Sequence, residues 1–405
     1  MPFITNQIGT MSRIPLSVPS LRGNEWKYVK ECIDTEWVSS AGKYVDLFEQ
    51  KVVEYTNSGY AVACINGTSA LQVGLRLVGV QPGDEVIVPT LTFIATVNAI
   101  SYNGANPLFM DVDPYYNIDI EKVADFLANE TKQVSVTDGK SRNTYSVTVN
   151  KKTERPIRAI LPVHVWGNAA RLQDLVPLCE ERNISVVEDA SESLGTTYIE
   201  GTYSGQHTGT IGKLGCLSFN GNKIITTGGG GMILTKFKGL AEKARYLTTQ
   251  AKDDSLRYIH DEIGYNHRLT NIQAALGVAQ MEQVHDFLDQ KSKIFDRYQA
   301  ALSQVDGLAF HQVPDYARNN HWMNLVQIDF SIYGGSKEQL IQKLADNGIQ
   351  ARPVWSLNHL QKPYSNQQSY RIENALRLAE NSLCLPSSSN LSNDDIDRVI
   401  NLLNE

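Results

Sequence analysis

Between about residue 60 and residue 235, the sequence repeats one pattern, in which a short apolar run is followed by turn residues and then by a stretch with helical periodicity. Such alternation predicts an α/β domain built on a largely parallel sheet. Most of the runs are nearly continuous in apolar residues, as expected for strands that helices cover on both faces. We therefore predict one large seven-stranded sheet, with strands at Tyr60–Ile65, Glu85–Pro89, Pro107–Asp111, Arg158–Val163, Ile184–Glu188, Cys216–Phe219 and Met232–Thr235.

One segment departs from this pattern. Val134–Val136 and Tyr145–Val149 alternate apolar with polar residues on either side of Asp138-Gly139, which predicts a surface hairpin inserted between strands. The hairpin either faces a substrate or decorates the surface, and the sequence leaves both interpretations open.

The pattern of apolar residues changes after about residue 258. A long stretch with helical periodicity is followed by shorter mixed elements. Here we predict a long helix at Asn271–Tyr298, a strand at Asn324–Asp329, a helix at Lys337–Asp346 and a terminal helix at Asp394–Leu403. We therefore expect a large α/β domain over residues 1–258 and a smaller C-terminal α+β domain over residues 259–405.

Composition narrows the class of protein. The 405 residues carry 37 lysines and arginines against 44 aspartates and glutamates, a formal charge of −7, whereas a nucleic-acid-binding domain is usually basic. The five cysteines are odd in number and scattered without a C-x-x-C pair, so we expect a reducing compartment and no metal site. No signal peptide and no apolar run of about 18 residues occurs, so we expect a cytoplasmic protein with neither nucleic acid nor membrane as a partner.

Two groups capable of chemistry follow predicted strands. The pair Glu188-Asp189 follows the apolar run Ile184–Val187, which places a carboxylate at the sheet edge where open α/β sheets bind ligands. Ser218 ends another strand, and Lys223 follows it in a turn rich in asparagine and glycine. Taken singly, the aspartate also suits a helix cap or a solvated turn, and the lysine suits an ordinary surface position.

A third group lies where a strand turns into a helix. Gly67, Thr68 and Ser69 precede a helical pattern, so they offer free N–H groups and the positive end of a helix dipole to a phosphate. A simple N-cap explains the same residues equally well. Phe93 adds an aromatic ring at the end of the next strand. The run Gly228–Gly231 is not a P-loop, because no lysine with serine or threonine follows it.

Together these residues match the needs of pyridoxal phosphate. This cofactor requires a lysine for covalent attachment, an aspartate beside the pyridine nitrogen, a ring to stack on, and N–H and hydroxyl groups for the phosphate. The conjunction is much more specific than any one member. We therefore expect pyridoxal 5'-phosphate as the cofactor.

Seven motifs follow one another along the chain, namely NGTSAL, TFIATVNA, PVHVWG, VVEDASESLG, SFNGNK, TTGGGGM and GYNHRLTNIQAALG. In this order they resemble the sugar aminotransferases of the DegT/DnrJ/EryC1/StrS family, and the resemblance runs from Ile14 to the terminal helix. It implies the aspartate-aminotransferase-like fold, which is PLP fold type I, with the cofactor bound in the larger domain. This implication agrees with the α/β class that the strand pattern predicts.

The resemblance implies roles for four residues around the cofactor ring. Lys223 in SFNGNK resembles the lysine that binds the cofactor covalently and performs catalysis. Asp189 in EDASE resembles the partner of the pyridine nitrogen, and Phe93 in TFIAT resembles the stacked ring. Glu192 falls where relatives carry histidine, glutamine or glutamate near the 3-hydroxyl of the cofactor.

The resemblance also implies how the phosphate is held. The backbone at Gly67 and the residues Thr68, Ser69 and Ser218 would bind it within one chain. Asn266 in GYNHR resembles a residue that reaches the phosphate across a dimer interface. The partner implied is therefore a second copy of the chain, in a homodimer with shared active sites.

The reaction implied is transamination from L-glutamate to a keto sugar, with Lys223 moving the proton. Segments at Lys132–Arg158, Asn319–Asn324 and Arg352–Trp355 look most like members that aminate C4 of a UDP-linked 2-acetamido-4-keto-6-deoxyhexose. Such a nucleotide-sugar product serves surface glycans of the lipopolysaccharide or O-antigen kind. Amination at C3 and a GDP- or dTDP-linked sugar remain alternatives. A sugar dehydratase and a catalytically silent sensor are two further alternatives. Related dehydratases carry histidine in place of Lys223, so the lysine favours transamination.

Four residues are candidates for contact with the substrates. His321 and Trp322 could contact the sugar, although an aromatic cluster at the start of a strand explains them equally well. Arg268 or Arg352 could bind a donor carboxylate or a nucleotide phosphate through a bidentate contact, and the sequence does not choose between them.

Overall fold

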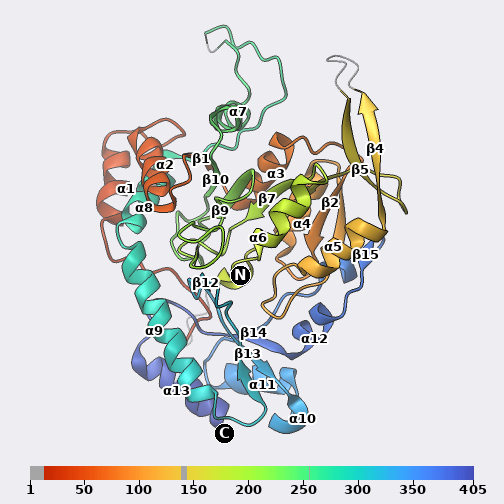
Figure 1. Ribbon diagram of the computed structural model, residues 1–405. Coiled ribbons are helices and arrows are strands. Elements are labelled where there is room, and N and C mark those ends of the chain that lie inside the picture. Colours follow the sequence, from red (N-terminus) through yellow and green to blue (C-terminus); the bar gives the residue numbers. More distant parts are fainter. Residues whose placement is uncertain (1–12, 138–143, 255) are drawn as a thin grey trace.

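One sheet organises the larger part of the molecule, and helices lie on both of its faces (Figure 1). The computed structural model describes residues 13–137, 144–254 and 256–405. Its strands are β1 (Tyr60–Cys64), β2 (Glu85–Pro89), β3 (Asn106–Met110), β4 (Thr131–Thr137), β5 (Thr144–Asn150), β6 (Ile157–Ile160), β7 (Ser185–Asp189), β8 (Thr197–Tyr198), β9 (Leu214–Ser218), β10 (Gly231–Thr235), β11 (Leu308–Phe310), β12 (Ala317–Arg318), β13 (Asn324–Ile328), β14 (Arg352–Pro353), β15 (Ser369–Tyr370) and β16 (Ser382–Leu385). Its α-helices are α1 (Glu25–Asp34), α2 (Lys43–Thr56), α3 (Gly67–Leu77), α4 (Ile94–Tyr102), α5 (Ile120–Asn129), α6 (Leu172–Glu180), α7 (Lys238–Thr248), α8 (Asn271–Met281), α9 (Val284–Leu302), α10 (Phe330–Tyr333), α11 (Lys337–Asp346), α12 (Asn374–Asn381) and α13 (Asn393–Asn404).

The large sheet has the strand order β1-β10-β9-β7-β6-β2-β3-β15. Strand β10 is antiparallel to both β1 and β9, and the other neighbouring strands are parallel. The predicted α/β class with a mostly parallel sheet is therefore confirmed. The predicted number of strands is corrected, because Ser369–Tyr370 from the C-terminal part adds β15 beside β3 as an eighth strand.

Alternate residues of the central strands pack toward opposite faces of the sheet. In β2, Val86 and Val88 belong to the hydrophobic core formed with α3, α4 and α7. Ile87 belongs instead to the core formed with α5 and α6. Because every residue of β2 is buried, both faces require apolar side chains, which explains the continuous apolar runs in the sequence.

A second sheet lies in the C-terminal part, with the antiparallel order β11-β13-β16-β14. It shares a hydrophobic core with α9, α11 and α13. The strand predicted at Asn324–Asp329 is β13, and the helices predicted at Lys337–Asp346 and Asp394–Leu403 are α11 and α13. The domain boundary between residues 258 and 259 stays a prediction.

The long helix predicted over Asn271–Tyr298 is wrong, because α8 and α9 are separate helices with Glu282 and Gln283 between them. Asn24 Nδ2 donates a hydrogen bond to the Glu282 carboxylate at 2.8 Å, and Gln283 Nε2 donates one to Glu25 Oε1 at 3.1 Å. Contacts with the N-terminal segment therefore accompany the break, and helical periodicity along α8 and α9 does not reveal them.

The predicted surface hairpin is confirmed as β4 and β5, which pair in antiparallel register from Thr131 with Asn150 to Thr137 with Thr144. Most of β4 is exposed, whereas the last residues of β5 are buried. The turn predicted at Asp138-Gly139 lies outside the described residues.

All five cysteines are buried and free. Among the residues described, no helix combines the length and the apolar character needed to cross a membrane. The described part of the chain also holds no group of three or more histidine, cysteine or acidic side chains arranged to bind a metal ion.

Candidate active site

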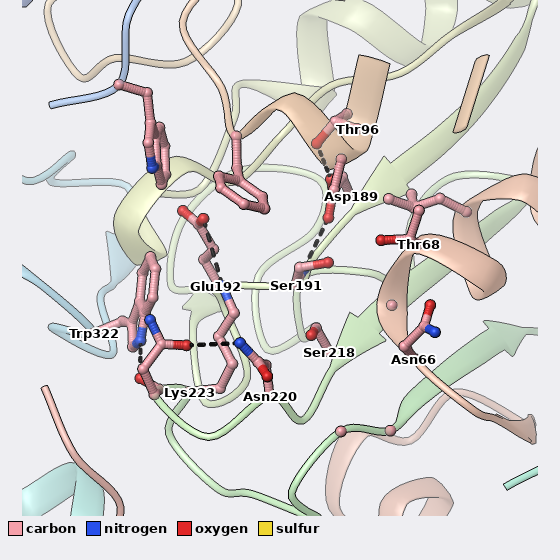
Figure 2. Close-up of a pocket in the computed structure, with 18 residues that line it drawn as sticks. Asn66, Thr68, Thr96, Asp189, Ser191, Glu192, Ser218, Asn220, Lys223 and Trp322 are labelled. Carbon is pink, nitrogen blue, oxygen red and sulfur yellow. Dashed lines mark hydrogen bonds and ion pairs between the residues drawn. The ribbon is translucent and has the colours of Figure 1, made fainter. Parts of the chain in front are cut away.

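A cavity of about 310 Å³ opens at the edge of the large sheet where β7 and β9 end (Figure 2). Asp189 is the last residue of β7 and Ser218 the last residue of β9, and both line the cavity. This is the carboxyl edge of parallel strands, where open α/β sheets bind ligands. The lining residues are Asn66, Gly67, Thr68, Leu71, Phe93, Ala95, Thr96, Asp189, Ser191, Glu192, Ser218, Asn220, Asn222, Lys223, Gly229, Gly230, Trp322 and Trp355.

The start of α3 gives one wall of the cavity a place for an anion. Asn66 caps the helix, since its Oδ1 accepts a hydrogen bond from the backbone N–H of Ser69 at 2.8 Å. Gly67 packs so closely on Ser218 that an added Cβ would lie 2.8 Å from the Ser218 Cβ. With Thr68 beside them, the backbone N–H groups of this turn and the positive helix end favour a bound anion. Ser69 itself does not line the cavity.

Asp189 is buried and held by two hydrogen bonds. Thr96 Oγ1 donates to Asp189 Oδ2 at 2.7 Å, and the backbone N–H of Ser191 donates to Oδ1 at 3.0 Å. These bonds fix the plane of the carboxylate. Each carboxylate oxygen can accept more than one hydrogen bond, so the side chain can still accept one from an N–H group of a ligand.

Lys223 and Glu192 are neighbours in the cavity. Lys223 Nζ lies 3.6 Å from Glu192 Oε1, and the backbone N–H of Trp166 donates to Glu192 Oε2 at 2.7 Å. Burial raises the pKa of Glu192 to about 7, although Lys223 and the Trp166 N–H act to lower it. Burial lowers the pKa of Lys223, although the carboxylates of Glu192 and Asp189 act to raise it. Both groups therefore exchange protons closer to neutral pH than in water.

Aromatic rings form another part of the wall. Phe93, at the start of α4, is 53% exposed, and its ring centroid lies 6.1 Å from that of Trp355. Trp355 stacks on Trp166 with 4.9 Å between centroids. Lys223 Nζ lies 3.8 Å from the centroid of Trp322, which is a cation–π distance. The cavity therefore combines an exposed ring, a fixed carboxylate and a lysine amine.

Asn266 and Arg268 lie away from this cavity within one chain. Both line a second cavity of about 400 Å³, and Arg268 Nη2 lies 3.6 Å from Asp46 Oδ1. The contact predicted for Asn266 involves the cavity of another subunit, so its place in its own chain does not test that prediction.

His321 and Arg352 line neither of these two cavities. The His321 ring stacks on Phe295 with 3.9 Å between centroids, and burial lowers the pKa of His321 to about 3. Arg352 is exposed on β14. Although His321 and Trp322 are adjacent in sequence, only Trp322 lines the first cavity. Within one chain, His321 and Arg352 therefore do not line the cavity that holds Lys223, and their contact with a substrate stays a prediction.

Several lining residues were not named as site residues from the sequence, including Asn66, Thr96 and Ser191, and Trp355 was noted only as the end of the segment Arg352–Trp355. Thr96 had a usable signal, because it follows Phe93 by three residues, close to one helical turn. Asn66 and Ser191 are neighbours in sequence of predicted residues. Trp355 arrives from the C-terminal part of the chain, and no local pattern indicates its partners.

Comparisons with known proteins show the family of the chain. The model of the DegT/DnrJ/EryC1/StrS aminotransferase family matches residues 19–404. The chain is 36% identical over 397 residues to EpsN of Bacillus subtilis (strain 168), which is named as a pyridoxal phosphate-dependent aminotransferase; the match covers 96% of this chain and 95% of EpsN. It is 37% identical over 396 residues to GDP-perosamine synthase of Escherichia coli O157:H7, covering 98% of this chain and 99% of that protein.

A solved structure shows the same fold. The crystal structure of the aminotransferase TlmJ from Streptoalloteichus hindustanus has a TM-score of 0.82 and 27% identity, and the match covers 97% of this chain and 98% of TlmJ. The predicted aspartate-aminotransferase-like fold, PLP fold type I, is confirmed. The chain therefore belongs to the DegT/DnrJ/EryC1/StrS family of sugar aminotransferases, which depend on pyridoxal phosphate.

Proposed function

We propose that the enzyme transfers the amino group of L-glutamate to the C4 keto carbon of a nucleotide-linked 4-keto-6-deoxy sugar in the cytoplasm, for surface glycan synthesis. The observation that carries the proposal is that Lys223, Asp189 and Glu192 line one cavity beside the start of α3. This set suits the binding of pyridoxal phosphate and the movement of a proton next to it, and transamination needs both.

The lining residues fit the cofactor. The N–H groups of the first turn of α3, together with Thr68 and Ser218, would hold the phosphate. Gly67 suits this place, because a side chain there would collide with Ser218. Asp189, held by its two hydrogen bonds, would accept one from the protonated pyridine nitrogen. The exposed ring of Phe93 would stack on the cofactor.

Lys223 would attach the cofactor and then carry a proton. When bound, pyridoxal phosphate supplies an acceptor for the amino group and for the electrons released at the α-carbon of the donor. Because burial lowers the pKa of Lys223, its free amine can take up that proton at a pH closer to neutral. Glu192 lies 3.6 Å away, so it would stabilise the protonated lysine in addition to contacting the 3-hydroxyl.

Two acceptor sugars are candidates. The sequence segments at Lys132–Arg158, Asn319–Asn324 and Arg352–Trp355 favour a UDP-linked 2-acetamido-4-keto-6-deoxyhexose. The 37% identity to GDP-perosamine synthase favours a GDP-linked 4-keto-6-deoxyhexose as the second candidate. Both carry the keto group at C4, so the proposed reaction at the reacting carbon is the same.

A panel of keto sugars tests the proposal. Purified enzyme is incubated with L-glutamate and with UDP-, GDP- and dTDP-linked 4-keto-6-deoxy sugars, and with a 3-keto sugar nucleotide. Release of 2-oxoglutarate and an amino group at C4, located by NMR, would support the proposal. An amino group at C3, or loss of water without amino transfer, would contradict it. Bound cofactor with no transfer to any sugar would indicate the silent sensor.

The role of Lys223 has its own test. Lys223→Ala should lower turnover by at least about 100-fold, because the group that transfers the proton is removed. Borohydride should fix the cofactor on the peptide that contains Lys223 in the wild-type protein, and a mass measurement should find no such adduct in the variant. Lys213→Ala is the matched control, because Lys213 is an exposed lysine just before β9. Fixation on another lysine would contradict the assignment.

We also propose that the enzyme is a homodimer with shared active sites. Asn266 lines a cavity other than the one that holds Lys223. Just before Asn266 in the chain, Leu256 and Ile263 are each 80% exposed, and a second copy of the chain would cover such apolar side chains. The resemblance of GYNHR to a motif that acts across an interface supports the same arrangement.

Complementation tests the shared site. Lys223→Ala and Asn266→Ala dimers should each have low activity. When the two are unfolded together and refolded as a mixture, about half of the dimers should be hybrids, each with one intact site, which gives about a quarter of the wild-type activity. Activity equal to the average of the two separate variants would contradict a shared site.

A further inference from the structure

Lys291 is a buried lysine for which the proposed reaction has no use. Its side chain lies on α9 and is 3% exposed. Its Nζ donates hydrogen bonds to the backbone carbonyls of Trp322, at 3.0 Å, and Ser387, at 2.6 Å. Burial lowers the pKa of Lys291 to about 7, and no acidic group among the described residues counters that shift. Burial of an amine without a counter-ion lowers the stability of the folded chain. We therefore asked what its contact with Trp322 contributes to the site.

Trp322 is held at three of its atoms. Its backbone N–H donates to Asn320 Oδ1 at 2.9 Å, and its carbonyl accepts the hydrogen bond from Lys291. Its indole Nε1 donates to the carbonyl of Asn222 at 2.6 Å. Asn222 directly precedes Lys223 in the chain. The indole ring therefore cannot turn without breaking a hydrogen bond to the segment that carries the proposed catalytic lysine.

The amine of Lys223 lies on this fixed ring. Figure 2 shows its side chain next to Trp322 and Glu192. Nζ is 3.8 Å from the centroid of the indole and 3.6 Å from Glu192 Oε1. A protonated amine is attracted both to the face of an indole ring and to a carboxylate. These two contacts define one position for the amine whenever it is not bonded to the cofactor.

We propose that Trp322 is a positioning residue for the free amine of Lys223, and that Lys291 keeps Trp322 in place. The inference rests on the proposed function, in which Lys223 carries a proton after it has released the cofactor. A lysine side chain is flexible and samples many rotamers, most of which do not point the amine toward the reacting atoms. Contacts that hold the free amine in one position reduce this sampling. Because Lys223 covers one face of the indole, that face is closed to a sugar, so this role differs from a sugar contact.

Trp322→Leu tests the inference in the glutamate half-reaction. We expect kcat to fall about 5-fold, with the KM for glutamate changed less than about 2-fold, because the ring orients the proton carrier and does not bind the donor. Deuterium at the α-carbon of glutamate should give a larger isotope effect than in the wild-type enzyme, since proton transfer becomes slower. Trp322→Phe keeps an aromatic face and loses Nε1, so its kcat and its isotope effect should lie between those of the wild-type enzyme and those of Trp322→Leu.

A second readout does not depend on turnover. The full-length chain without cofactor is acetylated with acetic anhydride over a range of pH, and the peptide with Lys223 is quantified by mass. Removing the ring should lower the pH of half-maximal acetylation by about half a unit, because the protonated amine loses the attraction of the indole and keeps those of Glu192 and Asp189. Wild-type and Trp322→Phe proteins should titrate close to one another.

Lys291→Met tests the second part of the inference. Methionine has a similar length and no amine, so we expect a change in the same direction as for Trp322→Leu, in kcat, isotope effect and acetylation pH. Lys337→Met is the matched control, because Lys337 Nζ also donates to two backbone carbonyls, those of Ala379 and Glu380, outside the cavity. It should leave all three readouts unchanged. Circular dichroism checks folding. A Lys291→Met chain that does not fold would overturn the second part of the inference, because Lys291 would then support the fold as a whole, and Trp322→Leu and Trp322→Phe would still decide the first part.

The outcomes separate this inference from the proposed function. A folded Trp322→Leu protein with an unchanged isotope effect and an unchanged acetylation pH would overturn the inference while Lys223→Ala still abolished turnover. A rise only in the KM for the sugar would assign Trp322 to sugar binding and would also overturn it. Failure of the wild-type enzyme to release 2-oxoglutarate from glutamate would instead overturn the proposed function, and the acetylation profile would still decide on Trp322.

Discussion

Thr96 Oγ1 donates a hydrogen bond to Asp189 Oδ2 at 2.7 Å, and this contact joins α4 to the end of β7. Phe93, at the start of α4, lies about one helical turn before Thr96. The short motif TFIAT therefore supplies both the ring that we propose to stack on the cofactor and the hydroxyl that orients the carboxylate. Two functions that look independent in the sequence depend on the placement of one helix.

Thr96→Val should reveal how much this contact matters. Valine keeps the shape of threonine and removes the hydroxyl, so the buried carboxylate of Asp189 loses one donor. Hydrogen bonds to charged groups contribute about 1.5–3 kcal/mol, and we therefore expect kcat with glutamate to fall by about 10-fold. Thr96→Ser retains the hydroxyl and is the control. If the valine and serine variants turned over glutamate equally fast, the contact would have no part in orienting Asp189.

The fold could be predicted where burial leaves a simple pattern. The central strands need apolar side chains on both faces, so runs such as Val86–Val88 are visible in the sequence. The strand at Ser369–Tyr370 has only two residues and no pattern of its own, and it exists because it pairs with β3. The break between α8 and α9 is likewise accompanied by side chains of the distant segment at Asn24 and Glu25.

The candidate site likewise contains some residues that a local pattern predicts and others that only contacts between distant segments bring together. Asp189 and Ser218 could be predicted, because the ends of parallel strands meet at one edge of the sheet. Trp322 was predicted only as a candidate for sugar contact, and its contact with Lys223 joins residues about 100 positions apart. His321 was predicted as a sugar contact from the resemblance of the segment Asn319–Asn324, and its ring packs on Phe295. Contacts between distant segments leave no local signal in one sequence.

Glu192 should make the stability of the chain depend on pH near neutrality. Burial raises the pKa of Glu192 from 4.5 to about 7, so the folded chain keeps a proton there that the unfolded chain releases. Stability from this group is therefore complete below about pH 4.5 and is lost as the pH rises toward 7. A shift of this size corresponds to about 3 kcal/mol at about 1.4 kcal/mol per unit.

Urea unfolding of the cofactor-free chain between pH 5 and 8 checks this prediction. Glu192→Gln cannot release a proton at this position, so the wild-type protein should lose stability relative to the variant as the pH rises. Glu54→Gln, which changes an exposed glutamate on α2, controls for a lost charge and should follow the wild-type curve. Parallel curves for the wild type and Glu192→Gln would show that Glu192 titrates as it does in water.

Asp111 should stabilise the fold at neutral pH and stop doing so in acid. Its buried carboxylate pairs with Lys122 at 2.7 Å and accepts backbone N–H groups at the start of α12, including that of Ala375 at 2.8 Å. Burial alone would raise the pKa of Asp111, but Lys122 and these N–H groups outweigh it and hold the pKa below its usual value. The stabilisation is therefore present above about pH 4 and is lost as the pH falls through the lowered pKa.

Asp111→Asn should accordingly cost about 2 kcal/mol at pH 7, and the difference from the wild type should shrink as the pH approaches 3. Thermal unfolding at several pH values measures it. Glu373→Gln is the control, because Glu373 also pairs with Lys122 but its side chain is 76% exposed, and such a pair contributes less than about 1 kcal/mol. Equal losses in both variants would mean that burial does not set the strength of these pairs.

Gly67→Ala should weaken cofactor binding without unfolding the protein. The added Cβ would lie 2.8 Å from the Ser218 Cβ and 3.4 Å from Ser191 Oγ, so Ser218 must move away from the helix start where we propose the phosphate to bind. Overpacking of this kind costs about 1–3 kcal/mol, and we expect the Kd for pyridoxal phosphate, measured by absorbance titration, to rise by about 10-fold. Gly221→Ala is the control, because a Cβ at Gly221 meets no atom within 4 Å. Alanine also favours a helix more than glycine does, so we expect the Gly67→Ala chain to fold. If the folded Gly67→Ala chain bound the cofactor as tightly as Gly221→Ala, the phosphate would have to bind elsewhere.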